Sequence, residues 1–253
     1  MSPPYDKNET EEQLAEGTLI SHLLELRSRI MKAVLAVIAV FLGLTPWMNE
    51  VFEFVSKPLR EALPEGSEMI VTDVAAPFLT PMKTAFFVAV FIAMPVVLFQ
   101  VWQFVAPGLY KREKRLAVPL MISSIVLFYS GIAFAYFIVF KVMFAFFAGV
   151  TPSGVDMTPD ISAYLSFVLG IFLAFGLAFE VPIATILLIW SGLVSIKALK
   201  SARPYVFLGA FVAGMLLAPD VFSMTLMAIP MYLLYEGGLI MARVLLPHKV
   251  AAI

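Results

Sequence analysis

Glu180 is the single acidic residue in a long apolar run that extends from Tyr164 to Trp190. A charged side chain at the centre of a bilayer costs about 2.5–3.5 kcal/mol, so such a residue usually faces protein or a wet cavity. Gly176 and Ala184, four residues to either side, form a stripe of small residues that lets another helix approach. We therefore predict that Glu180 faces protein rather than lipid. A purely structural, hydrogen-bonded glutamate is the simpler alternative.

Two further acids lie within basic stretches, Glu25 in ELRSR and Glu113 in KREKR. Guanidinium and carboxylate groups form planar, charge-assisted hydrogen bonds, so two carboxylates on one face could receive a cationic partner. Phe104 and Trp102 would add apolar surface beside such a site, although aromatic residues at a span end are more often interfacial anchors. The alternative is that neighbouring bases simply neutralise each acid, in exposed pairs worth about 0–1 kcal/mol.

The composition is that of a polytopic membrane protein. Of 253 residues, 61% are hydrophobic and 14% charged, and the mean hydropathy is +0.95. The absence of cysteine excludes disulfides and thiolate catalysis. Because His22 and His248 are the only imidazoles, a histidine metal site or catalytic triad has little material. We therefore expect neither an enzyme nor a cofactor.

The apolar pattern predicts an all-α membrane protein with six transmembrane helices. The spans are expected at about 30–47, 84–106, 116–140, 164–190, 205–218 and 221–241. The last two are expected to be short, since the fifth would reach only about 21 Å against about 30 Å of hydrocarbon. Residues 1–20 are expected to form a flexible acidic tail, 21–242 one transmembrane domain, and 243–253 a second tail.

The distribution of Lys and Arg predicts the orientation. Thirteen of these residues fall on one side of the predicted spans and four on the other. By the positive-inside rule both termini are cytoplasmic, which agrees with an even number of spans. The outer segment 48–82 alternates apolar and acidic residues, and we expect a cap of short interfacial helices broken at Pro58 and Pro64.

Several motifs together resemble the TatC family, the membrane receptor subunit of the twin-arginine protein translocase. They are HLLELRSR from His22, QVWQFVAPGLY from Gln100 followed by Glu113, FEVP from Phe179, RPY from Arg203, and PDV from Pro219. The resemblance covers about Ser21 to Met241. It implies a cup-shaped six-helix bundle in the bacterial cytoplasmic (inner) membrane.

The resemblance also implies a function and partners. Such a protein binds twin-arginine signal peptides of folded cargo and recruits single-span TatA- and TatB-type proteins. Transport is then driven by the proton-motive force within a hetero-oligomer of several copies, with the lipid bilayer as a further partner. No nucleic acid partner is expected.

The residue roles that the resemblance implies fall into three groups. They are signal-peptide binding by Glu25, Arg27, Phe104 and Glu113; an intramembrane groove for a partner helix at Glu180, Ser223 and Thr225; and sensitive outer positions at Pro58 and Asp220. Some family members have polar residues where this chain has Ala218 and Met224, which leaves Ser223 and Thr225 as the hydroxyl donors.

Two alternatives come from other functional classes. In a proton-coupled small-solute transporter, Glu180 would be the protonation site. Against it stand the lack of an apparent inverted repeat, the short fifth span, and the absence of further acids in the spans beyond peripheral Glu236. An intramembrane protease would need metal-binding or dyad residues on the membrane helices, and the sequence does not offer them.

Overall fold

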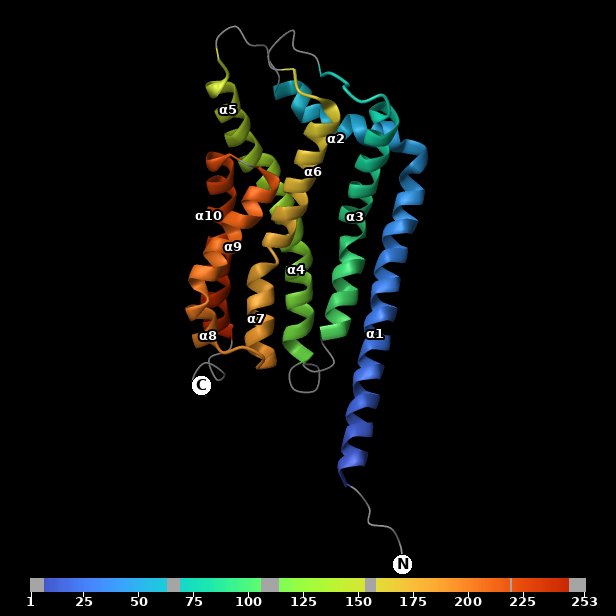
Figure 1. Cartoon of the computed structure of the whole chain (residues 1–253), viewed down its shortest axis with the longest axis vertical. Coiled ribbons are helices and arrows are strands. Elements are labelled where there is room, and N and C mark those ends of the chain that lie inside the picture. The colour runs from blue at the N-terminus through green and yellow to red at the C-terminus, as the bar shows by residue number, and fades with distance from the viewer. Residues whose placement is uncertain (1–6, 63–68, 106–113, 153–157, 219, 246–253) are drawn as a thin grey trace, which may run out of the picture.

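The protein is a bundle of long helices, and its computed structural model describes residues 7–62, 69–105, 114–152, 158–218 and 220–245 (Figure 1). The helices are α1 (Lys7–Leu44), α2 (Met48–Ala62), α3 (Ala76–Val105), α4 (Lys114–Phe134), α5 (Phe140–Val150), α6 (Ile161–Ala178), α7 (Val181–Ser191), α8 (Ile196–Ser201), α9 (Arg203–Leu217) and α10 (Val221–Leu245). The start of α1 and the end of α10 lie at the same, lower end of the bundle in Figure 1.

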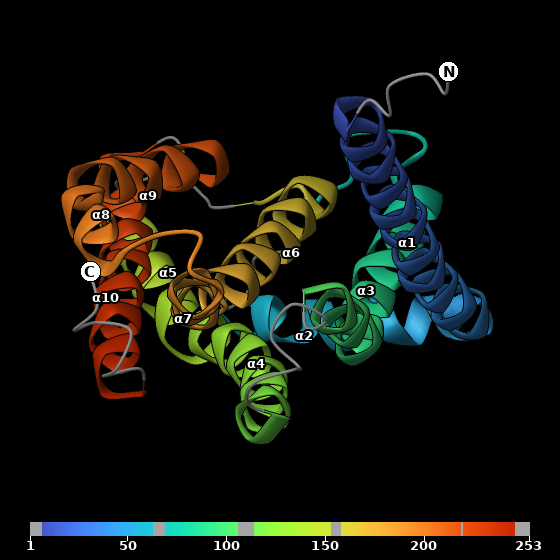
Figure 2. The ribbon, with the colours of Figure 1, turned by 90° about the horizontal axis from the view of Figure 1, so that it is seen from below.

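The helices stand side by side with neighbours along the chain mostly adjacent in space. Seen from below, α1 and α3 lie at one side, α9 and α10 at the other, and α4, α6 and α7 between them (Figure 2). The main contacts join α1 to α3, α4 to α6, α7 to α10, and α9 to α10. Fully buried side chains such as Phe128, Phe175, Met143 and Leu165 form the core between the central helices.

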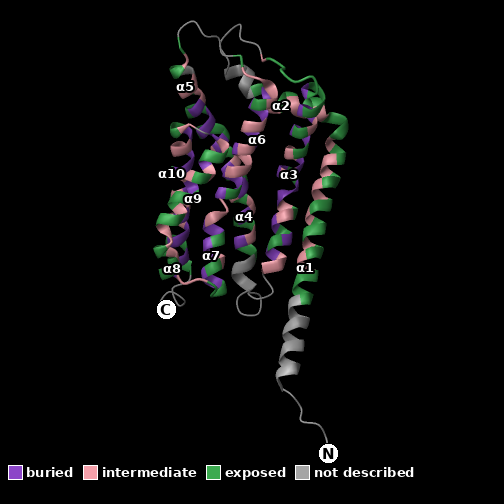
Figure 3. Ribbon diagram, in the orientation of Figure 1, coloured by how far each residue is buried: buried purple, intermediate pink, exposed green. Residues whose placement is uncertain are grey.

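Apolar side chains also cover much of the outer surface. In Figure 3 the buried residues lie mostly on the central helices, whereas the described part of α1 is exposed or intermediate throughout. Five helical segments are long and apolar enough to cross a membrane, and α9 is a shorter apolar helix. The predicted all-α, multi-span class is therefore confirmed.

The short fifth span is confirmed and the short sixth span is wrong. α9 has 15 residues, which at 1.5 Å per residue reach about 22 Å. α10 has 25 residues and continues past Met241 to Leu245 with Pro230 inside it. Arg243 lies in its last turn, where a positive charge is favourable.

Two predicted spans are too short because a single lysine was taken as a boundary. α3 begins at Ala76, before Lys83, rather than at Thr84. The third span continues past Lys141: α4 passes through a π-helical segment, Ala135–Val139, into α5, which ends at Val150. A lysine can remain in such a span because its long stem lies along apolar surface while the ammonium reaches water.

The two ends of the first span also differ from the prediction. α1 begins at Lys7, so residues 7–20 of the predicted flexible tail are helical. This stretch contains four glutamates, which favour helix and suit a helix N-terminus. At the outer end α2 is not broken at Pro58 but continues to Ala62. The proline removes one hydrogen bond close to the end of α2, and the helix retains its packing against α3. Pro64 lies outside the described residues.

The fourth span is two helices with a turn between them. α6 ends at Ala178, and α7 starts at Val181 after a turn at Phe179 and Glu180. Pro182 has no N–H to donate to the carbonyl of Ala178, so one helical hydrogen bond is missing at this junction. Glu180 instead donates its backbone N–H to the carbonyl of Leu177 at 3.0 Å. The acid is thus placed at a helix junction within the membrane-spanning region.

Candidate functional site

The guanidinium of Arg29 connects α1 to α3 near the lower end of the bundle. Its Nη2 donates to Glu25 Oε1 at 3.2 Å, one helical turn away on α1. Its Nη1 faces α3, where it donates to Gln103 Oε1 and, at 3.4 Å, to Gln100 Oε1. Residues three or four apart share a helix face, so each helix presents a matched pair to the other. Three polar side chains, those of Glu25, Gln100 and Gln103, therefore surround one guanidinium.

An aromatic contact lies beside this network. His22, three residues before Glu25, stacks on Phe104, which follows Gln103, with ring centroids 4.5 Å apart. Phe104 is half-buried, and neighbouring Trp102 is buried. We call Glu25, Arg29, Gln100, Gln103 and the His22–Phe104 stack the α1–α3 site. It combines a carboxylate, amide oxygens and an aromatic wall, a combination suited to binding a cationic peptide rather than to catalysis.

The α1–α3 site includes part of the predicted signal-binding set. Glu25 and Phe104 are brought together, whereas the Arg27 side chain is exposed and makes no hydrogen bond or ion pair within the described part of the chain. Glu113 lies outside the described residues, so its role stays a prediction. Sequence reasoning did not select Arg29, Gln100 or Gln103. The four-residue spacing of Glu25 and Arg29 and the three-residue spacing of the two glutamines were the available signals.

Glu180 faces protein, as predicted. Ser124 on α4 donates its hydroxyl to Glu180 Oε2, while Oε1 is buried without a hydrogen-bond partner among the described residues. Sequence reasoning did not identify Ser124. Ser124 and Glu180 are 56 residues apart in sequence, so only the packing of α4 against α6 shows that they meet.

Small residues let α4 and α6 approach closely next to Glu180. A Cβ on Gly176 would come within 2.6 Å of the Phe128 ring, and one on Gly131 within 2.4 Å of the Phe175 carbonyl oxygen. The predicted approach of a helix at Gly176 is thus confirmed, and the helix is α4. Ala184, the other member of the predicted stripe, is exposed.

The outer and partner-helix residues have mixed environments. Asp220 caps α10 by accepting from the Ser223 N–H at 2.7 Å, while the Ser223 side chain is fully buried. Thr225 donates its hydroxyl to the carbonyl of Val221 at 2.7 Å. The Ser223 hydroxyl is therefore buried, whereas the Thr225 hydroxyl forms an exposed hydrogen bond within α10. Pro58 lies within α2 near its end.

Asp160 was not predicted as a site residue, yet it connects two segments at the upper end. Its Oδ2 accepts the Thr72 hydroxyl at 2.6 Å and the Thr72 N–H at 3.0 Å, and its Oδ1 accepts the Ala163 N–H at 2.8 Å. A short bridge between Ile70 and Asp160 adds backbone pairing. These hydrogen bonds, led by that from the Thr72 hydroxyl, hold the pKa of Asp160 below its ordinary value.

A second ion pair joins the lower ends of α9 and α10. Arg203 donates to Glu236 Oε2 at 2.6 Å, and the Tyr232 hydroxyl donates to Glu236 Oε1 at 3.0 Å. Glu236 is thus paired across the helix interface. Among the described residues, no group of three or more His, Asp or Glu side chains could hold a metal ion.

The chain is similar to known proteins in sequence and in structure. The family model described as Sec-independent protein translocase protein (TatC) matches residues 21–230. The chain is 58% identical over 221 residues to the Sec-independent protein translocase protein TatC of Azotobacter chroococcum mcd 1, covering 87% of each chain. It is 54% identical over 226 residues to the TatC of Escherichia coli (strain K12), covering 89% of this chain and 88% of that one.

A solved structure agrees with the sequence matches. The crystal structure of a twin-arginine translocase receptor, TatC, superposes with a TM-score of 0.80 at 38% identity, covering 88% of this chain and 98% of that chain. The protein is therefore a multi-pass membrane protein of protein transport and not an enzyme. Since the family model and these relatives each cover more than four fifths of its length, this chain belongs to the TatC family.

Proposed function

We propose that this chain is the receptor of a twin-arginine translocase and that the α1–α3 site binds the paired arginines of signal peptides. The supporting observation is that Glu25, Gln100 and Gln103 already surround a guanidinium, that of Arg29. A site that coordinates one guanidinium has the geometry to coordinate another. The His22–Phe104 stack offers apolar surface for the neighbouring residues of the peptide.

Binding proceeds by exchange of guanidinium groups. An arginine of the signal peptide replaces Arg29 at Glu25, and the second arginine binds Glu113, the other acid of the predicted pair. Exposed fractions of 22% for Arg29 and 34% for Glu25 leave the existing pair accessible to a competitor. An exposed pair of this kind is worth at most about 1 kcal/mol, so a peptide can displace it.

The test is Glu25→Gln, which removes the charge and retains the shape. We expect binding of a twin-arginine signal peptide to weaken about tenfold or more, since a hydrogen bond to a charged group is worth about 1.5–3 kcal/mol. The measurement is peptide titration to the purified chain in detergent. Glu53→Gln is the matched control, because Glu53 is an exposed acid on α2 at the opposite end of the bundle.

Two results would contradict this role. One is unchanged peptide affinity in Glu25→Gln, and the other is equal wild-type affinity for a peptide whose two arginines are replaced by lysines. The second result matters because lysine cannot form the planar two-point contact with a carboxylate.

We further propose that Glu180 organises a groove that receives a partner's transmembrane helix or the inserted signal peptide. Its Oε1 is an acceptor without a partner among the described residues, next to the close α4–α6 crossing. The expected result is that Glu180→Gln reduces co-purification of TatA- and TatB-type single-span proteins while twin-arginine peptide binding at the α1–α3 site is unaffected. Undiminished co-purification would remove this role from Glu180. Ser223, Thr225, Pro58 and Asp220 remain proposed as sensitive positions of the same partner-facing and outer regions.

We also propose a transport cycle for this receptor. Both termini lie in the cytoplasm, the bundle forms a cup, and several copies assemble with TatA- and TatB-type partners to export folded cargo by the proton-motive force. Membership of the TatC family favours this cycle over the small-solute transporter. Uptake of a small solute driven by a pH gradient, in vesicles containing this chain alone, would reverse that preference.

A further inference from the structure

A cavity of about 770 Å³ lies between α2, α6 and the continuous helical rod that α4, the π-helical segment and α5 form together. It is lined by none of the residues of the α1–α3 site. Most of its wall is aromatic, contributed in part by Tyr129, Phe140, Phe144 and Phe172. Tyr136 and Phe137, from the π-helical segment between α4 and α5, also line it. Single π-helical turns within α-helices frequently mark functional sites, because the extra residue redirects neighbouring side chains.

The charges among the described lining residues of this cavity have one sign. Its described lining includes the lysines Lys57 of α2 and Lys141 of α5, and no aspartate or glutamate. Both lysine side chains are exposed. α2 lies at the upper end of the bundle, and α5 leads up to that end from the π-helical segment (Figure 1). The cavity therefore has a basic opening at the upper end and an aromatic interior.

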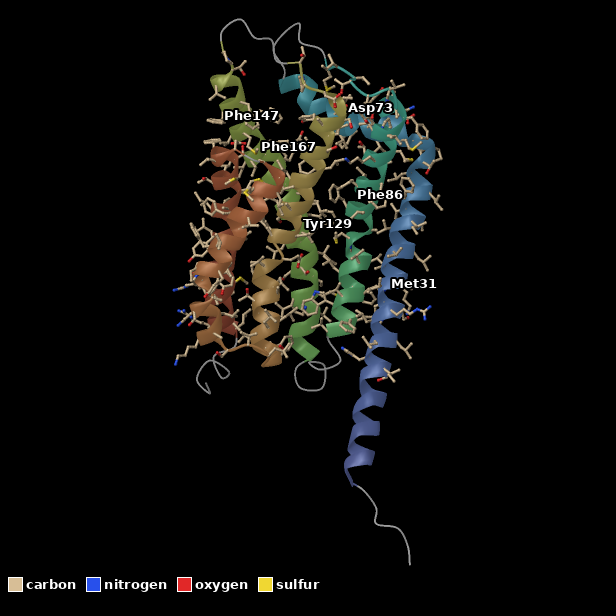
Figure 4. The ribbon with its side chains drawn as sticks, viewed as in Figure 1. Met31, Asp73, Phe86, Tyr129, Phe147 and Phe167 are labelled. Carbon is tan, nitrogen blue, oxygen red and sulfur yellow. The ribbon has the colours of Figure 1, made fainter. Side chains whose placement is uncertain are left out.

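The cavity spans about one leaflet. Tyr129 lies near mid-height of the bundle and Phe147 near the upper end in Figure 4. Along the continuous rod from Tyr129 to Lys141, 12 residues at 1.5 Å each give about 18 Å. Half of a hydrocarbon core of about 30 Å is about 15 Å. A ligand that fits this depth has a charged group at the interface and an apolar body that ends near the bilayer centre.

The volume is that of a small-molecule site. At about 770 Å³ it lies within the range of about 300–1,000 Å³ that is usual for such sites. An acyl chain is thin enough to fit the aromatic interior.

We propose that this cavity is a binding site for one anionic phospholipid of the leaflet at the upper end of the bundle. Its phosphate-bearing headgroup lies between Lys57 and Lys141, and an acyl chain extends along the aromatic wall towards Tyr129. Lysine side chains near a membrane surface attract anionic headgroups, which supplies the preference over a zwitterionic lipid. Tyr129 itself is fixed at the deep end by donating its hydroxyl to the Phe91 carbonyl at 2.9 Å.

The experiment is native mass spectrometry of the full chain in detergent, titrated with phosphatidylglycerol or phosphatidylcholine. We expect one phosphatidylglycerol to bind at least about tenfold more tightly than phosphatidylcholine. The double variant Lys57→Gln/Lys141→Gln should lose this preference. The matched control Lys83→Gln should retain it, because Lys83 is an exposed lysine on α3 that donates to Ser166 at 2.7 Å and does not line the cavity.

A second variant tests the cavity without altering charge. Ala133 is an exposed lining residue, so Ala133→Trp should fill the space, leave both lysines in place, and abolish binding of phosphatidylglycerol. The proposal is overturned if wild-type protein binds the two lipids equally, or if the double lysine variant retains the preference. Retention of phosphatidylglycerol by Ala133→Trp would overturn it too, since the lysines would then bind the lipid at the surface alone.

Discussion

At the residue scale, the defining feature is a partly exposed carboxylate, Glu25, paired with a guanidinium. Glu25 is held by Arg29 from the same helix, and two glutamines from α3 complete the shell around the guanidinium. The pair is partly exposed, so solvent screening limits its contribution to stability to at most about 1 kcal/mol. The network therefore contributes more to the geometry of the site than to the stability of the bundle.

The first prediction concerns Arg29→Gln. Removing the internal competitor and its positive charge should tighten binding of a twin-arginine peptide by up to about fivefold, the equivalent of about 1 kcal/mol. Peptide titration in detergent measures the change. Lys32→Gln is the control, because it removes an equal charge from an exposed position on α1. If Arg29→Gln instead abolished binding, Arg29 would be needed to position Glu25, and the exchange mechanism would be wrong.

At the element scale, glycines determine how closely helices pack, and hydrogen bonds fasten the outer segments. The α4–α6 crossing depends on Gly131 and Gly176, and the α7–α10 crossing on Gly238, whose Cβ would approach Pro182 Cα to 2.8 Å. Lipid tails are as apolar as the side chains, so the hydrophobic effect does not drive transmembrane helices together. Close approach of the helices instead stabilises the bundle through van der Waals packing. At the upper end, Asp160 fastens the segment before α3 to α6.

The second prediction compares two glycines within helices. Gly131→Ala should destabilise the bundle by about 1–3 kcal/mol, because its Cβ would lie 2.4 Å from a backbone oxygen that cannot move alone. Gly237→Ala should be neutral or stabilising by up to about 1 kcal/mol, because nothing lies within 4 Å of its Cβ. Thermal unfolding in detergent compares them. Equal midpoints would show that the α4–α6 crossing is not close.

The third prediction concerns acid sensitivity at the upper end. The lowered pKa of Asp160 means that the folded state favours the ionised carboxylate. Its contribution to folding stability is therefore fully present above about pH 3.9, the pKa of Asp in the unfolded chain, and is lost as the pH falls through the lower pKa of the folded state. Asp160→Ala should therefore reduce the thermal midpoint at neutral pH, and the difference from wild type should shrink in strong acid. Glu53→Ala serves as the control. A difference that grew on acidification would contradict this sign.

At the scale of the whole molecule, the arrangement separates two sites along the long axis of the bundle. The α1–α3 site lies near the end where α1 starts and α10 finishes, whereas the start of α6, next to Asp160, and α2, which carries Lys57, lie near the other end (Figure 1). α9 is shorter than the hydrocarbon thickness, so a bilayer thins beside it or α9 lies deeper than its neighbours.

The fourth prediction tests orientation, which the absence of cysteine makes simple. Val74, 99% exposed between α2 and α3, and Lys200, exposed on α8, lie towards opposite ends of the bundle. In intact cells Val74→Cys should react with an impermeant maleimide, whereas Lys200→Cys should react only after permeabilisation. The unmodified chain is the control, since it contains no thiol. The reverse labelling pattern would invert the proposed topology.

The sequence by itself determined the all-α, multi-span membrane class and the shortness of the fifth apolar segment. Those features depend on local composition, since each span must bury its own length in hydrocarbon. Boundaries were less accurate at Lys83, Lys141 and Pro58, because a single charged residue or proline does not end a helix that packs well on other helices.

Only the tertiary structure decided which groups meet. Arg29 reaches Gln103 across 74 residues of sequence, and Ser124 reaches Glu180 across 56. The aromatic cavity likewise draws its walls from helices that are distant in sequence. Contacts of this kind arise from the packing of one helix face on another, and hydrophobic periodicity along a chain marks the apolar residues without specifying which face meets which.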